Sequence, residues 1–122
     1  MTALHMLDRE VRLVDTREAL GFRRPTLDSS FTIPIPADHD PTAAVLHITT
    51  TAAAGPGYVT LYGDNAGNTS KLNYAAGDLS PQANTTLVNV GRDATGRPVV
   101  RGMMRGAHVA DLIVDLVAVI SP

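Results

Sequence analysis

Cysteine and tryptophan are absent from this chain of 122 residues, and aromatic residues make up only 4% of it. Without cysteine there is no disulfide, no thiolate nucleophile and no cysteine-ligated metal, so stability must come from packing. The scarcity of aromatic rings leaves few stacking surfaces for bases or sugars. The length suits one domain with a sizeable core but is too short for two.

A strong charge of either sign and a long apolar run are also missing. The formal net charge is -2, which provides no basic field for a phosphate backbone, so we expect no nucleic-acid partner. Crossing a bilayer as a helix takes about 20 apolar residues. The longest run, LIVDLVAVI at 112–120, is much shorter and contains Asp115, so we expect no membrane segment. The opening residues lack the features of a secretory signal, which predicts a product that starts inside the cell.

Short strand patterns separated by turn residues dominate the chain from Thr32 onward. Two prolines, Pro34 and Pro36, confine FTIPIPAD to a sheet edge or a loop entry. The stretch AAVLHITTT at 43–51 alternates as a central strand should, and YVTLY at 58–62 is predicted to be its hairpin partner or close neighbour. The closing run LIVDLVAVI is predicted to be a strand buried on both faces.

These patterns predict an all-β fold, an antiparallel β-sandwich of jelly-roll type in a single domain, with seven to nine strands and no convincing helix. Asp93 and Gly96 in RDATGR suit a hairpin connection. The opening residues carry apolar side chains at helical spacing but fit an extended arm equally well. We assign 1–11 to an N-terminal arm and 12–122 to the β-sandwich domain.

Reactive or metal-binding groups are few. Asp38, His39 and Asp40 form the most metal-like cluster, but they lie in a proline-flanked turn where aspartates cap the backbone, and no further ligand spacing follows. No nucleophile elbow and no phosphate-binding loop is present. We therefore predict no catalytic residue, no cofactor, no metal and no enzymatic activity.

The stretch RLVDTR at 12–17 places an acid, a hydroxyl and a base side by side. Asp115 would share one face of the closing strand with Ile113, Val117 and Val119, with the remaining apolar residues of that strand on the other. A carboxylate in such surroundings is costly unless it is paired. Arg17 or Arg12 could bind it through two parallel hydrogen bonds. We predict that Asp15, Arg17 and Asp115 form a structural latch between the first and last strands, rather than a site for acid-base chemistry.

A series of motifs in one order resembles a β module that recurs in actinobacterial secreted and surface proteins. The series is RLVDTR, AAVLHITTT, GPGYVTLY, SKLNYAAGD, NTTLVNVG, a D-x-x-G turn and LIVDLVAVI, and it covers Arg12 to Ile120. The module typically begins with Arg-Leu-x-Asp-Thr-Arg and ends with an HVIVDV-type strand. This chain departs from it in three places: the insert Glu18-Ala19-Leu20 before Gly21, Asp111 where a histidine is usual with His108 upstream, and Ala118-Val119-Ile120 where a glycine and two aromatics are usual.

The resemblance implies an accessory module without catalytic residues, used for surface adhesion or assembly. A freestanding copy made inside a cell suggests a virion protein of an actinobacterial phage, by analogy. We predict a capsid decoration protein or tail component, located in the virion, whose partners are phage capsid or tail proteins. Two-sided apolar strands, together with Val99, Val100, Met103 and Met104, offer more apolar surface than a lone small sandwich covers, which favours a homo-oligomer, preferably a trimer.

The alternative prediction is a β-sandwich module that binds carbohydrate of the cell envelope. Tyr58, Tyr62 and Tyr74 would be the ligand-facing rings, with Asn65, Asn68 and Asn73 as hydrogen-bonding groups. Against it, Tyr58 and Tyr62 would share a strand face with Thr60, where tyrosines are usually packing residues.

Overall fold

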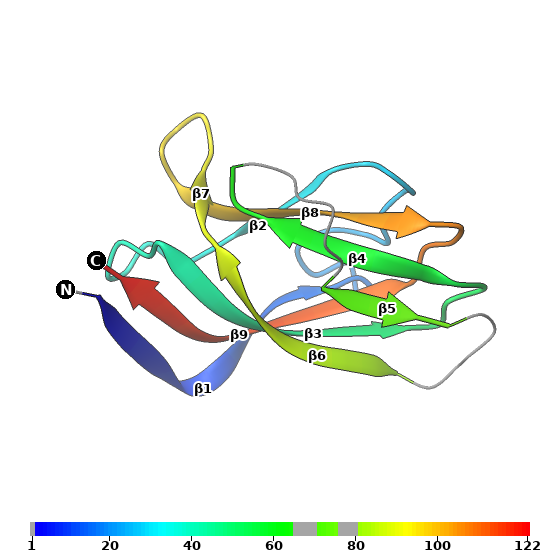
Figure 1. The fold of residues 1–122 in the computed structure, drawn as a ribbon, viewed down its shortest axis with the longest axis horizontal. Helices are drawn as coiled ribbons and strands as arrows, with labels where there is room; N and C mark the ends of the chain where they lie inside the picture. Colours follow the sequence, from blue (N-terminus) through cyan, green and yellow to red (C-terminus); the bar gives the residue numbers. More distant parts are fainter. Residues whose placement is uncertain (1, 65–70, 76–80) are drawn as a thin grey trace.

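Two antiparallel sheets packed face to face make up the protein (Figure 1). The computed structural model describes residues 2–64, 71–75 and 81–122, and within them the chain forms nine strands and no helix. The strands are β1 (Ala3–Asp15), β2 (Phe31–Pro34), β3 (Ala43–Thr51), β4 (Gly57–Tyr62), β5 (Leu72–Tyr74), β6 (Gln82–Asn89), β7 (Gly91–Arg92), β8 (Pro98–Gly106) and β9 (Asp111–Ser121). The predicted all-β sandwich is thus confirmed. No described segment forms a helix long and apolar enough to cross a membrane.

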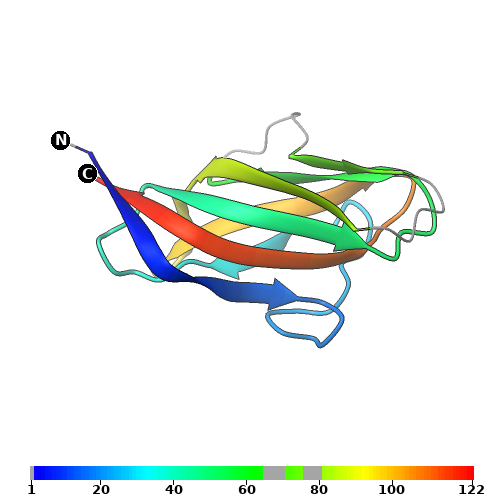
Figure 2. The same cartoon turned by 90° about the horizontal axis from the view of Figure 1, so that it is seen from below.

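The first and last strands of the chain are neighbours in one of the two sheets. The four-stranded sheet, here sheet A, has the order β1-β9-β3-β6, and the five-stranded sheet B has the order β2-β8-β4-β5 with β7 beside β8 (Figures 1 and 2). The predicted hairpin of 43–51 with 58–62 is wrong, because β3 lies in sheet A and β4 in sheet B. The prolines did predict an edge correctly, since among the described strands β2 pairs with β8 alone.

Apolar side chains from the inner faces of both sheets form one core. On β3 the alternation is as predicted: Leu46 and Ile48 are fully buried, whereas Val45 and His47 are only half-buried. Opposite them, four strands of sheet B contribute core residues, among them Ile33, Val59, Leu61, Leu72, Val100 and Met104. The hairpin between β7 and β8 also forms as predicted, with Asp93 accepting hydrogen bonds from the backbone of the turn and Gly96 at a φ of 85°.

A β-bulge changes the faces of the last strand. Between Ala118 and Leu116, β9 advances two residues while its neighbour β3 advances one, so Val117 is the extra residue. The alternation therefore inverts after Leu116. Val119 joins the core, beside Ala44 of β3, instead of sharing a face with Asp115 as predicted. Strand β9 is nevertheless buried over most of its length on both faces, as the sequence indicated.

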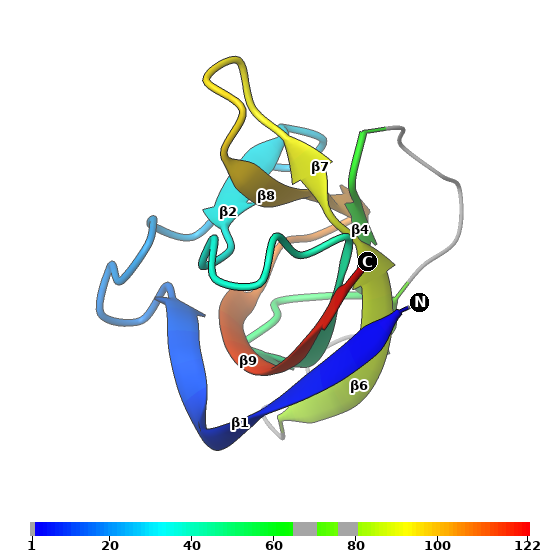
Figure 3. The same cartoon turned by 90° about the vertical axis from the view of Figure 1, so that its left-hand side faces the viewer.

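Strand β1 extends across the predicted boundary between an arm at 1–11 and the domain at 12–122. Ala3 to Met6 already pair with the end of β9, from Ala3 opposite Ser121 onward. An irregular bulge of four residues follows, because β1 has residues 7–10 where β9 has only Val117. Figure 3 shows the resulting bend of β1. The residues assigned to an arm are thus the first part of a strand that lies at the edge of sheet A.

Candidate functional site

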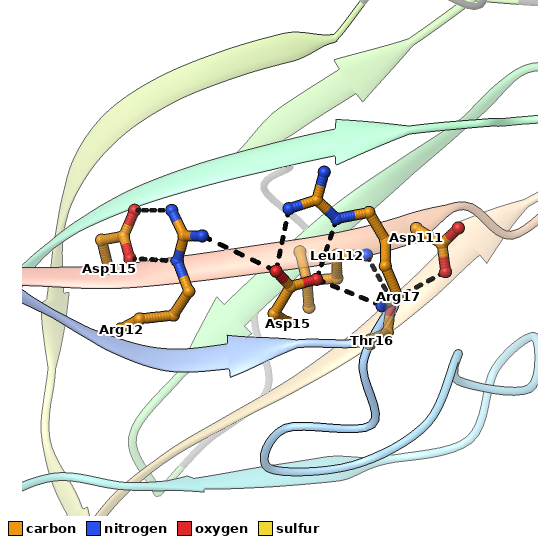
Figure 4. A network of polar contacts seen from close by, with 7 residues as sticks. All are labelled: Arg12, Asp15, Thr16, Arg17, Asp111, Leu112 and Asp115. Atoms are coloured by element: carbon orange, nitrogen blue, oxygen red, sulfur yellow. Dashed lines mark hydrogen bonds and ion pairs between the residues drawn. The ribbon is translucent and has the colours of Figure 1, made fainter.

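The RLVDTR segment lies where β1 ends against β9, and it organises a network of polar contacts (Figure 4). The chain reverses directly after Asp15: the backbones of Asp15 and Leu20 exchange two hydrogen bonds of 3.0 Å each. Ala19 and Gly21 take positive φ values of 55° and 80° in this reversal. The tight turn holds the charged side chains of the motif beside the middle of the last strand.

Arg12 supplies the cation that Asp115 requires. The two residues are direct cross-strand partners, and the guanidinium donates from Nε at 2.9 Å and from Nη2 at 3.3 Å to the two carboxylate oxygens. The Asp115 side chain is 11% exposed and that of Arg12 is 48% exposed. The contact therefore neutralises a nearly buried carboxylate with an arginine that still reaches water, which reduces the cost of burial.

Arg17 pairs with Asp15 rather than with Asp115. Its backbone N–H and its Nε donate to Oδ1 of Asp15 at 3.1 and 2.9 Å, and its Nη2 donates to Oδ2 at 2.8 Å. Arg12 Nη1 lies 3.6 Å from the same carboxylate, so Arg12 connects Asp15 to Asp115. The structure therefore brings the three predicted latch residues together only through Arg12, which the sequence had offered as the second choice.

Thr16 and two residues that sequence reasoning missed extend the network to the start of β9. The Thr16 hydroxyl donates to Oδ1 of Asp111 at 2.9 Å and accepts from the backbone N–H of Leu112 at 2.8 Å. Arg24 Nη2 donates to the other oxygen of Asp111 at 2.7 Å. Asp111 could have been found from its place four residues before Asp115, whereas Arg24 comes from a loop that carries no signal.

Three guanidinium groups face three carboxylates, so the network is electrically balanced. The side-chain hydrogen bonds from Arg17 lower the pKa of Asp15, and those from Arg24, followed by Thr16, lower the pKa of Asp111, although burial opposes the shift in both. Both carboxyl groups thus stay ionised at neutral pH, which makes them poor general acids, and their oxygens are occupied. The arrangement is suited to joining strands.

Acid should weaken the protein through these carboxylates. A carboxyl group with a lowered pKa in the folded state stabilises the fold above its unfolded-state pKa of about 3.9, and this stabilisation is lost as the pH falls through the folded-state pKa. We expect the free energy of unfolding, measured with urea, to fall steeply below about pH 4. Asp15→Asn should show a shallower decline, and equal declines in both proteins would contradict the assignment.

The three tyrosines of the alternative prediction have different environments. Tyr74 is 5% exposed, its hydroxyl donates to the carbonyl of His108, and burial raises its pKa. Tyr58 and Tyr62 are half-buried and alternate with the core residues Val59 and Leu61, so they lie on the outer face of sheet B. Asn65 and Asn68 lie outside the described residues.

The residues of the predicted metal-like cluster do not act together, because His39 and Asp40 contact different partners. His39 stacks on His5, with ring centroids 3.8 Å apart, and Asp40 accepts a hydrogen bond of 2.7 Å from Arg92. Throughout 2–64, 71–75 and 81–122, no three side chains of metal-ligating type converge on one point.

No protein-family model matches the chain, and no curated protein or solved structure shows detectable similarity to it. The resemblance to the actinobacterial module therefore stays a prediction from the motifs.

Proposed function

We propose that the protein is a non-enzymatic structural component of a virion, a capsid decoration protein or tail component of an actinobacterial phage, that acts as a homo-oligomer. The motif resemblance supports an accessory module of surface type. The observation that carries the proposal is an apolar patch on the outer face of sheet A, which would be covered in an assembly.

The apolar patch runs across all four strands of sheet A. One row of cross-strand neighbours consists of Met6, Ala118, Val45 and Leu87, from β1, β9, β3 and β6 in turn. The next row places Leu4 beside Ile120, which pairs with Ala43. The apolar patch comprises Leu4, Met6, Ala43, Val45, Leu87, Ala118 and Ile120.

Three large side chains of the apolar patch extend into solvent. Leu4, Met6 and Leu87 are 58%, 63% and 54% exposed, and none of the seven patch residues is charged. The neighbouring row is polar, with Arg12, Asp115, His47 and Thr85. An apolar area with a polar border is typical of protein interfaces, so a partner surface is expected to cover it.

The proposed trimer would follow the threefold positions that decoration proteins often occupy. A ring of three needs heterologous contacts, in which the patch of one subunit meets a different surface of the next. The tight charge balance around Asp15 supports a scaffold role over catalysis, because no guanidinium of the network lacks a carboxylate partner.

Adding charge to the apolar patch should disrupt assembly. We expect the wild-type protein to form an oligomer by light scattering after size exclusion, and the double variant Met6→Lys, Leu87→Lys to be a monomer, because two charges would be buried at the interface. Leu20→Lys is the matched control, since Leu20 is 44% exposed but lies in the turn after β1, outside the patch. A wild-type protein that stays monomeric at all concentrations would contradict the proposal.

Carbohydrate binding remains the second candidate, and it rests on Tyr58 and Tyr62. Their strand partners on β8 are Arg105 and Arg101, so rings and guanidinium groups share the outer face of sheet B. A glycan array separates the two functions: binding of envelope glycans by the wild type that is lost in Tyr58→Ala would favour carbohydrate recognition. Association with virions and no glycan signal would favour the structural role.

A further inference from the structure

A cavity of about 190 Å³ lies between the first and last strands and the loop that leads into β3. Its lining residues are Leu7, Val11, Pro36, Asp38, His39, Leu116 and Val119. Leu116 and Val119 are almost fully buried and belong to the core, so the cavity reaches the hydrophobic interior from the surface. An apolar cavity of about 150 Å³ is large enough to hold a benzene molecule.

Two of the β-bulges of sheet A lie beside the cavity. Strand β1 has residues 7–10 where β9 has only Val117, so β1 bends here instead of following β9 (Figure 3). The bulge at Val117 turns Val119 inward, toward Ala44. Because bulges redirect side chains and are frequent beside functional sites, their coincidence at one cavity points to a binding site.

The loop on the opposite side of the cavity is held in a costly backbone conformation. His39 and Asp40 are consecutive residues with φ values of 67° and 52°, a region that residues other than glycine rarely adopt. Such a conformation persists only where its surroundings enforce it, and it is frequent where a protein clamps a ligand.

Two contacts enforce this loop conformation. The His39 ring stacks on that of His5 at an angle of 8° between planes, and His5 shares a hydrogen bond of 2.7 Å with the Ser121 hydroxyl. On the other side, Arg92 donates to Asp40 at 2.7 Å. The wall formed by the loop is therefore set in place before any ligand binds, which lowers the entropic cost of binding.

The lining determines which ligand the cavity would take. Five of its seven residues are apolar, and the only formal charge is the carboxylate of Asp38, which makes no ion pair or hydrogen bond with another described residue. Arg92 of β7, which contacts this loop, already binds Asp40. We propose that the cavity binds a short alkylammonium or arylammonium compound, with its apolar part against Leu116 and Val119 and its cation toward Asp38.

The binding site is independent of the assembly role. The apolar patch contains Leu4 and Met6, which alternate with His5, and His5 contacts the loop at the cavity. The two surfaces therefore lie on opposite faces of β1. Loss of self-association and loss of ligand binding would be separate results.

Titration with three six-carbon probes tests the site. We expect n-hexylammonium to give saturable changes in the methyl NMR signals of Leu7, Val11, Leu116 and Val119. It should bind at least about fivefold more tightly than hexanoate, because a charge contact near water changes the binding energy by about 1 kcal/mol. Hexanol should fall between them. Absence of saturable changes at these methyl groups with all three probes would overturn the proposal.

Two variants identify the apolar and charged parts of the site. Val11→Phe fills the cavity from a position that is 45% exposed, so it should fold and bind n-hexylammonium at least tenfold more weakly. Leu4→Phe, on the other face of the same strand, is the matched control and should bind normally. Asp38→Asn should abolish the preference for n-hexylammonium over hexanoate and leave hexanol binding intact. Unchanged binding in Val11→Phe, or an unchanged preference in Asp38→Asn, would refute the assignment.

Discussion

Leu46→Ala should lower the free energy of unfolding by about 2 to 5 kcal/mol, since it removes buried methyl groups and leaves a void. Leu46 is completely buried on β3, an interior strand of sheet A that is bonded to β9 on one side and β6 on the other. Its neighbours are held by both strands, so they have little freedom to close the void. Urea denaturation monitored by circular dichroism measures the effect.

Leu87→Ala is the matched control for Leu46→Ala. The same change on the adjacent strand affects a side chain that is 54% exposed, so the free energy of unfolding of the monomer should change by less than about 0.5 kcal/mol. Because Leu87 belongs to the apolar patch, the variant should instead weaken self-association. Similar losses of stability in the two variants would mean that the outer face of sheet A is packed in the monomer.

Asp15→Ala should have the second-largest effect, a loss of about 2 kcal/mol, because hydrogen bonds to a charged group contribute more than neutral ones. The carboxylate is 1% exposed and accepts three hydrogen bonds from Arg17. Water can still reach the guanidinium groups left behind, which limits the cost. Asp8→Ala, an exposed position on the same strand, should change stability by less than about 0.5 kcal/mol.

Alanine variants of Arg12 and Arg17 test which contacts of the network join β1 to β9. Arg12→Ala should lower the melting temperature more than Arg17→Ala, because Arg12 contacts carboxylates on both β1 and β9 whereas Arg17 binds a carboxylate two residues away. A larger effect of Arg17→Ala would show that the turn after β1, and not the cross-strand pair, is the important element.

The sequence predicted those features of the fold that depend on local chemistry. Alternation in AAVLHITTT identified the buried face of β3, and the fixed geometry of proline placed β2 at an edge. Strand pairing is not local. The segment between β3 and β4 resembles a hairpin loop, yet the chain crosses there to the other sheet, and Ala52 takes a positive φ of 58° just after β3. Hydrophobic patterns cannot separate these two outcomes, because both bury the same side chains.

The candidate site was predictable in its chemistry but not in its register. A carboxylate at position 115 of an apolar strand requires a cation, and that requirement follows from burial alone. The choice between Arg12 and Arg17 depends on where β1 ends, because Arg12 lies opposite Asp115, whereas the chain turns back after Asp15 and Arg17 lies in that turn. The bulge at Val117 moved Val119 into the core. Periodicity has no means of locating a single inserted residue, so the faces of the residues after Val117 are predicted incorrectly.

The position of the last strand has a consequence for synthesis. Strand β9, 11 residues long, lies between β1 and β3. Sheet A therefore cannot form its β1–β9 and β9–β3 pairs until the residues of β9 have left the ribosome. The residues of β1 have their partners on β9 about a hundred positions or more later in the chain. Such distant pairing makes folding slow, on the order of milliseconds to seconds for β-sandwiches. The nascent chain should therefore stay open to chaperones and proteases until β9 has been made, and any copy cut short before β9 should be degraded.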